Sequence, residues 1–201
     1  MHGIVFAELK KFVDTTFDPT VWAELLKSSG LDGKIYLPTQ PYPDEDIIEL
    51  VSQACIRSGL SKEELLDQFG QFIVPDLLSI FNYAIQPSWK TLDLIENVES
   101  VIHKAVRINN KGAVPPKLTV SRVSQSVVEI IYQSPRRMEH LGVGIIKGIA
   151  AYFKEKVVVN CKVLTPETSL ISIKVRALLL HNSFREKKFT SCKRLGKSDF
   201  N

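Results

Sequence analysis

The stretch IIYQSPRR, residues 130–137, carries an apolar strand pattern into the start of a helical pattern. In an extended chain, side chains two residues apart share a face, so Tyr132, Ser134 and Arg136 converge. Two hydroxyl groups and a guanidinium form a donor set suited to a carboxylate or a phosphate. Ser134 and Pro135 also suit the N-cap and first position of a helix, whose positive end attracts anions. A plain sheet edge with an ordinary serine cap fits the same residues.

Apolar periodicity predicts the elements around this stretch. Before residue 112 it is helical, and the predicted helices cover residues 3–17, 18–30, 44–58, 61 onward and 89–109. After residue 116 it predicts hairpins over 118–124 with 126–134 and over 156–165 with 169–180, separated by a helix over 135–155. We therefore expect an α+β fold, with an N-terminal helical lobe followed by an antiparallel-sheet lobe that carries a helix.

Two positions in the fourth predicted helix carry local signals. Ser61 and Glu64 have the spacing of a capping box, in which each side chain bonds the other residue's backbone N–H. Pro75 lies fourteen residues beyond Ser61 and lacks a backbone N–H, so we expect it to end or kink the helix.

The net charge of +4 is concentrated at the C-terminus. Residues 182–201 hold six basic and two acidic side chains, and the remaining residues balance to zero. The body therefore lacks the basic surface of a nucleic-acid-binding protein. The basic tail at 182–201 is interpreted as a solvated chain end or, alternatively, as a docking segment for an acidic partner.

Cysteine usage and hydropathy indicate the compartment. Cys55, Cys161 and Cys192 are odd in number and far apart, which argues against a disulfide framework and for a reducing environment. No run of about 20 apolar residues is present for a membrane span. The N-terminus has no signal-peptide pattern. We expect a cytoplasmic protein with no membrane partner.

His103 lies within the predicted helix 89–109, at the edge of its apolar arc. A half-buried histidine bonded to a neighbour is the simple interpretation of one such residue. Taken with the donor set at 132–136, a second interpretation arises. An imidazole for iron, a cradle for two propionates and a helical lobe rich in Phe, Leu and Ile together match the needs of heme.

These residues resemble the heme–nitric oxide/oxygen binding (H-NOX, or HNOB) family, which includes the heme domain of soluble guanylate cyclase. The family's Tyr-x-Ser-x-Arg propionate motif matches residues 132–136, and its proximal histidine matches His103. Gly112 and Pro115-Pro116 follow as in the family, where the second proline presses on the porphyrin. The resemblance implies heme b (protoporphyrin IX iron) held between two lobes of one domain over residues 1–181. Residues 1–60 would form a distal helical lobe, and 61–181 the α+β lobe that holds the heme.

The distal positions differ from those of the family's oxygen-binding branch. That branch carries a tyrosine that donates to bound O₂, and Leu141 stands at the matching position. Its supporting tryptophan and asparagine are replaced by Leu9 and Ile73; Val5 and Leu77 complete the expected distal wall. A hydrogen bond to a charged group contributes about 1.5–3 kcal/mol, or roughly 10- to 150-fold in affinity. The resemblance therefore implies binding of nitric oxide and CO with little O₂ binding.

The resemblance implies a gas sensor without catalytic activity. Gas binding would weaken or break the bond between iron and His103, and a separate effector, a histidine kinase or a cyclic-di-GMP enzyme, would respond. Two alternatives remain at this point. One is a heme-free interaction or small-molecule-binding module of the same fold. The other is a heme-dependent oxidase, which would need polar distal groups and against which Leu141 argues.

Overall fold

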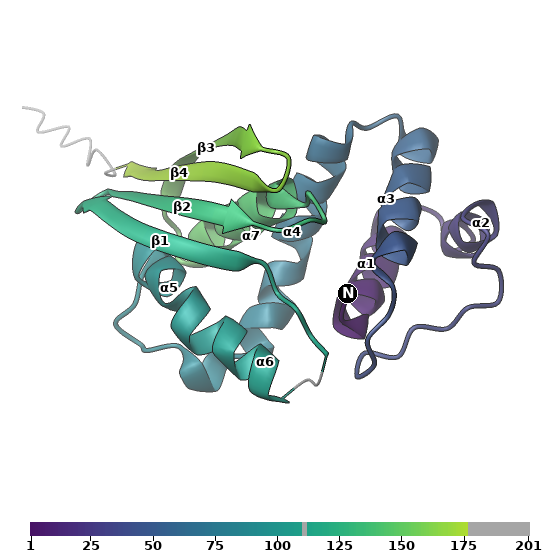
Figure 1. Ribbon diagram of the computed structural model, residues 1–201, viewed down its shortest axis with the longest axis horizontal. Coiled ribbons are helices and arrows are strands. Elements are labelled where there is room, and N and C mark those ends of the chain that lie inside the picture. The colour runs from purple at the N-terminus through teal and green to yellow at the C-terminus, as the bar shows by residue number, and fades with distance from the viewer. Residues whose placement is uncertain (110–111, 177–201) are drawn as a thin grey trace, which may run out of the picture.

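The computed structural model describes residues 1–109 and 112–176. Its helices are α1 (Gly3–Thr16), α2 (Val21–Ser28), α3 (Asp44–Ser58), α4 (Lys62–Ile80), a 3-10 turn (Asn82–Ala84), α5 (Thr91–Asn97), a π-helical segment (Val98–His103), α6 (Lys104–Asn109) and α7 (Glu139–Tyr152). Its strands are β1 (Lys117–Ser124), β2 (Val127–Gln133), β3 (Lys156–Thr165) and β4 (Thr168–Arg176). The α+β prediction is confirmed, with α1–α3 on one side of the molecule, the sheet on the other and α4 between them (Figure 1). The basic tail and the end of the last predicted strand lie outside the described residues.

The sheet lobe is an antiparallel sheet in the order β1-β2-β4-β3. Alternate residues of β2 are buried, as expected for a sheet with one face covered. The covered face packs on α5 and α7, through the buried side chains Leu92, Ile95, Val128, Ile130, Tyr132, Val143, Ile146, Ile171 and Ile173. Tyr132 thus projects from β2 onto the face that α5 and α7 occupy.

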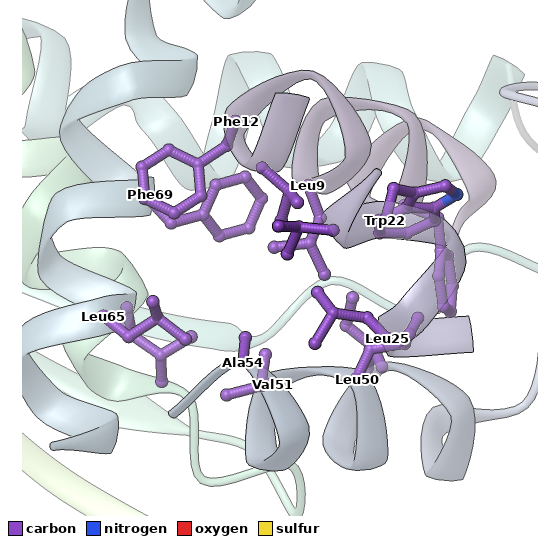
Figure 2. Packing of buried hydrophobic residues seen from close by; sticks show 14 of the residues in the cluster. Leu9, Phe12, Trp22, Leu25, Leu50, Val51, Ala54, Leu65 and Phe69 are labelled. Atoms are coloured by element: carbon purple, nitrogen blue, oxygen red, sulfur yellow. The ribbon is translucent and has the colours of Figure 1, made fainter. Parts of the chain in front are cut away.

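The helical lobe has its own core, called here the first-lobe cluster. It combines α1–α3 with the first half of α4, and includes Phe6, Leu9, Phe12, Trp22, Leu25, Ile47, Leu50, Val51, Leu65, Leu66, Phe69 and Ile73 (Figure 2). The second half of α4 belongs to a different cluster, in which Val74 and Leu78 contact Leu94 of α5 and Ile149 of α7. Helix α4 therefore contributes to the cores of both lobes.

Helices α4 and α7 cross at very short range. A Cβ on Gly144 would lie 2.1 Å from the Asp67 carbonyl oxygen, and one on Gly70 would lie 2.4 Å from the Leu141 carbonyl oxygen. Both distances are far below van der Waals contact, so only glycine fits at these positions without moving the backbone. The crossing fixes α7, and with it the sheet, against α4.

Pro75 does not end its helix, and that alternative of the prediction is wrong. Helix α4 continues from Pro75 to Ile80. Proline removes one backbone bond, to the Gln71 carbonyl, but packing against α7 holds the next turn in place. Helices α4 and α7 are also close together near Pro75, because a Cβ on Gly148 of α7 would lie 3.1 Å from the Gln71 carbonyl oxygen. The Ser61 capping box is present as predicted.

The predicted helix 89–109 is helical from Thr91 but not uniform. Its middle, Val98–His103, forms π-helical bonds between α5 and α6. Such segments are rare, are found often at functional sites, and are not foreseen from apolar periodicity. None of the helices in the described residues combines the length and apolar character needed to cross a membrane.

Candidate functional site

The donor motif lies in a turn between β2 and α7. Ser134 still bonds like a strand residue, since its backbone N–H donates to the Glu167 carbonyl at 2.9 Å. Its hydroxyl oxygen accepts from the Arg136 backbone N–H at 3.3 Å. Arg137 then adopts a positive φ of 52°, and α7 begins only after Met138. The prediction that Ser134 is the N-cap and Pro135 the first helical residue is therefore wrong, because this turn separates the strand from the helix.

Arg136 joins three segments that are distant in the chain. One guanidinium nitrogen donates to the Val114 carbonyl at 2.7 Å, and Nε lies 2.9 Å from Asp44 Oδ2 at the start of α3. The Asp44 carboxylate also pairs with the amine of Met1. Burial opposes ionisation of Asp44, but these two cationic groups outweigh it and lower its pKa. Asp44 thus supplies a charge at the motif that reasoning from sequence did not detect.

The Arg136 guanidinium is held in place, but one of its donors has no hydrogen-bond acceptor. Although Nε of Arg136 is buried and near Asp44, it makes no hydrogen bond of acceptable geometry. A buried donor without an aligned acceptor is unfavourable, and an anionic ligand at this position would remedy it.

Tyr132 and Ser134 are both nearly inaccessible to solvent, at 6% and 4% exposure. Burial raises the pKa of Tyr132 to about 12, although interactions with Ser134 and Met138 oppose the rise. The phenol is therefore neutral and able to donate a hydrogen bond at any physiological pH. Together with Arg136, the motif places neutral and cationic donor groups in one turn.

His103 is the last residue of the π segment, and its side chain is 15% exposed. Its Nδ1 lies 2.8 Å from Glu99 Oε2, and the other oxygen of Glu99 lies 2.6 Å from an Arg107 nitrogen. Burial lowers the pKa of His103, although Glu99 acts in the opposite direction. The neutral ring, with its proton on Nδ1 towards Glu99, presents the lone pair of Nε2 as a metal ligand.

The π segment and the donor motif both neighbour strand β1. The π segment contacts β1, whose Leu118 pairs with Tyr132 on β2. Pro115 and Pro116 are half-buried in the connection between α6 and β1, beside the Val114 carbonyl that Arg136 binds. The π segment, the prolines and the donor motif are therefore all adjacent to β1 or to the connection that precedes it.

The five expected distal-wall residues come together at the first-lobe cluster. Leu9 and Ile73 are buried members of it, and the half-buried Val5, Leu77 and Leu141 pack against it. Leu9 is only 1% exposed and lies among the packed side chains of α2 and α3 (Figure 2). The residues come from α1, α4 and α7, so folding unites positions that are distant in the sequence.

Two tyrosines also pack against the first-lobe cluster, but their hydroxyl groups have other partners. Tyr36 donates to Asp46 at 2.9 Å, and the Tyr42 oxygen accepts from the Leu37 backbone N–H at 2.7 Å. Tyr83 and Tyr152 are 70% and 61% exposed. These four phenols are therefore directed to partners or to solvent, and the hydrogen bonds described here bring none of them to Leu141.

The donor set fits heme. Iron in heme needs a single nitrogen from the protein, which His103 offers, and propionates need cationic and neutral donors, which Arg136, Tyr132 and Ser134 offer. The half-buried Pro116 and the apolar cluster supply contacts of the type that a porphyrin needs. Sequence reasoning identified these residues but overlooked Glu99 and Arg107, although their i, i+4 spacing about His103 was a readable signal.

Solved structures of H-NOX proteins share this fold. A crystal structure of an H-NOX protein from S. oneidensis in the Fe(II)NO ligation state aligns with a TM-score of 0.81 and 21% identity, over 88% of this chain and 100% of that one. A crystal structure of an Fe(II) unliganded H-NOX protein mutant from K. algicida gives 0.83 and 19%, over 89% and 98%. An NMR structure of the Shewanella oneidensis domain in the Fe(II)CO state gives 0.77 and 21%, over 88% and 99%. None of the curated proteins matches the chain.

The sequence itself matches a family. The model of the Haem-NO-binding (HNOB) family covers residues 2–161 of this chain. That range includes His103, the donor motif at 132–136 and Leu141, and it is most of the 201 residues. The chain therefore belongs to the Haem-NO-binding family.

Proposed function

We propose that the chain is a heme-based sensor that binds nitric oxide and CO at ferrous iron, with little binding of O₂. The observation that carries the proposal is the state of His103, a half-buried imidazole whose lowered pKa keeps it neutral, whose Nδ1 is held by Glu99 and whose Nε2 is left for a metal. Heme b is the proposed cofactor, and it would supply a ferrous iron able to bind a diatomic gas.

Four residues would hold the cofactor from the sheet lobe. Nε2 of His103 would bind the iron, and Tyr132, Ser134 and Arg136 would bind the propionates. Arg136 would then share its guanidinium between a propionate and Asp44, which already lies 2.9 Å from Nε. Pro116 would press on the porphyrin from the connection before β1.

The gas preference would come from the first-lobe cluster. Val5, Leu9, Ile73, Leu77 and Leu141 are apolar and have no hydrogen to donate to a bound gas. Bound O₂ carries partial negative charge and gains from a donor, whereas nitric oxide on ferrous iron gains much less. A wall built from these residues therefore favours nitric oxide and CO.

The signal would start at the end of the π segment. His103 tied to iron would fix the helical run from Thr91 to Asn109, which packs on both β1 and α7. Release of His103 would let this run and the Pro116 connection shift against the sheet, which is a population shift between two states. A separate effector, for which a histidine kinase or a cyclic-di-GMP enzyme is the proposed class, would read the shift. No catalytic role is proposed for the chain itself.

Absorption spectra of the purified, reduced protein test the proposal, recorded alone and with nitric oxide, CO and O₂. We expect a five-coordinate ferrous heme that changes spectrum with nitric oxide and CO and forms no stable O₂ complex. A stable O₂ complex would contradict the gas preference. A protein that stays colourless after heme supplementation would instead support the heme-free binding module.

A further inference from the structure

Three polar side chains contact one another on the helical run that carries His103. Glu99 bridges His103 and Arg107, with one carboxylate oxygen 2.8 Å from the ring nitrogen Nδ1 and the other 2.6 Å from the guanidinium. The side chains of His103 and Glu99 are 15% and 29% exposed, so the contact between them is partly shielded from water. Both oxygens of the carboxylate are thus in use, and its position is set from two sides.

The π geometry supports this contact. Glu99 and His103 both lie inside the Val98–His103 segment, where backbone bonds span five residues instead of four. The turn is therefore wider than in an α-helix, and residues four apart lie more nearly above one another. Because carboxylate and imidazole sit on the same segment, they move together when that segment moves.

We propose that Glu99 is a positioning residue for His103: its carboxylate accepts the Nδ1 proton, fixes the ring tautomer and increases the electron density on Nε2. Histidines that bind metals commonly donate their second N–H to a carboxylate, which orients the ring and makes it a stronger ligand. Arg107 holds the carboxylate in place from its other side. The inference rests on the proposed function, because it requires iron at Nε2.

The consequence concerns how easily His103 is released. A ring that shares its proton with a carboxylate is a stronger base and holds iron more firmly. Glu99 would therefore make release of His103 from a bound iron harder. The carboxylate sets the threshold of the sensor without touching iron or gas.

The competing interpretation is an ordinary ion pair on a helix. Arg107 is 43% exposed, and such pairs contribute little to stability. An ordinary pair would change the melting temperature slightly and leave the iron–histidine bond unaltered. The two interpretations therefore differ in spectroscopy of the iron–histidine bond.

The test compares Glu99→Gln and Glu99→Ala with the control Glu96→Gln. Glu96 lies on the same helical run, is 30% exposed and pairs with Arg122 instead of the histidine, so its variant removes the same charge nearby. Resonance Raman spectra of the reduced protein report the iron–histidine stretch. We expect this band to move to lower frequency in Glu99→Ala, to move less in Glu99→Gln, which keeps an acceptor, and to be unchanged in Glu96→Gln.

Two further measurements follow from the same cause. The midpoint potential of the iron should rise in the Glu99 variants, because a less electron-rich imidazole stabilises ferric iron less. Heme transfer to a scavenger protein should be about tenfold faster in Glu99→Ala. This is the lower limit of the effect usual for removing the hydrogen-bond partner of a metal-binding histidine, because the contacts with the porphyrin remain.

The outcomes separate the inference from the proposed function. Wild-type protein that takes up no heme would overturn both. Heme bound through His103, with the stretch unchanged in both Glu99 variants, would overturn only the role of Glu99. An equal shift in Glu96→Gln would also overturn it, because the effect would then be one of general charge. Circular dichroism would verify that the helices are intact in each variant.

Discussion

The first-lobe cluster and the helical run of His103 are built in opposite ways. The cluster gathers apolar side chains from α1, α2, α3, α4 and α7, and its expected ligand-facing members Val5, Leu77 and Leu141 are half-buried against it. The run from Thr91 to Asn109 instead carries charges on one continuous helical segment, where Glu99 links His103 and Arg107. One surface arises from packing between many segments, and the other arises from polar contacts within one.

The difference suggests a separate role for each surface under the proposed function. An apolar wall from several helices cannot donate a hydrogen bond, so a gas bound against it would gain none from it. A charged chain on a single segment moves as one unit, so it can tie the position of a helix to the state of its histidine. On the proposed function, gas choice would depend on the first-lobe cluster and the signal threshold on the His103 run.

The largest expected effect comes from His103→Gly, in the helical run from Thr91 to Asn109. The variant removes the proposed axial nitrogen, so the iron–histidine band should disappear entirely. Added imidazole should restore a five-coordinate ferrous spectrum, because the space of the side chain is left open. His140→Ala, on α7, is the control and should leave the band unchanged. An unaltered band in His103→Gly would assign the axial ligand elsewhere.

The next largest effect is expected from Leu141→Tyr, at the first-lobe cluster. A phenol at this position would give the first-lobe cluster a donor, and O₂ affinity should rise by roughly 10- to 150-fold. Leu141→Phe is the matched control, because it adds the ring without the hydroxyl. Stopped-flow or flash-photolysis measurements of O₂ binding would compare them. Equal O₂ affinity in the two variants would show that position 141 does not face the gas.

A third variant tests the close crossing of α4 and α7, which connects the first-lobe cluster to the sheet lobe. Gly144→Ala would place a Cβ 2.1 Å from the Asp67 carbonyl oxygen, so the free energy of unfolding should fall by about 1–3 kcal/mol. Gly142→Ala is the control, since its Cβ would meet nothing nearer than 3.9 Å and alanine favours a helix by about 0.5–1 kcal/mol. Urea denaturation should therefore shift in opposite directions for the two variants.

Local signals in the sequence were sufficient for much of this fold. The bounds of α3 are those predicted, because periodicity and a terminal Gly59 with positive φ agree there. The start of α7 was predicted wrongly, and at Pro75 only the alternative that the helix ends there was wrong, because contacts elsewhere decided both. The Ser134 N–H bonds the β3–β4 turn at Glu167, and α7 supports α4 beyond its proline.

The candidate site shows the same division. The donor motif could be proposed from sequence because its hydroxyl and guanidinium residues alternate where the β2 pattern ends, although Ser134 and Arg136 lie in the turn after β2. Glu99 could have been proposed from its spacing to His103. Asp44 could not, because no local pattern connects the first turn of α3 with a residue after β2. Its contact with Arg136 exists only because the two lobes meet at that point.

The smallest expected effect comes from Asp44, where the two lobes are joined by charge. Its pKa is lowered in the folded state by Arg136 and the Met1 amine, although burial opposes the shift. A lowered folded pKa means that the unfolded chain binds the proton more readily, so the contribution to stability is present above the ordinary value of 3.8 and is lost as pH falls through the folded value. Asp44→Asn should therefore be less stable than wild type at neutral pH, and the difference should vanish in acid.

The size of this difference should be below about 1 kcal/mol, because the Asp44 side chain is 32% exposed and water screens the pair. Glu45→Gln is the matched control, since it removes an exposed charge from the same first turn of α3 and so reproduces any interaction with the helix dipole. Urea denaturation from neutral pH to below 3.8 would compare the three proteins. A pH-independent difference for Asp44→Asn would mean that the Asp44 contacts stabilise the fold through packing. The contact between the lobes would then be apolar in character, like the first-lobe cluster, and not ionic.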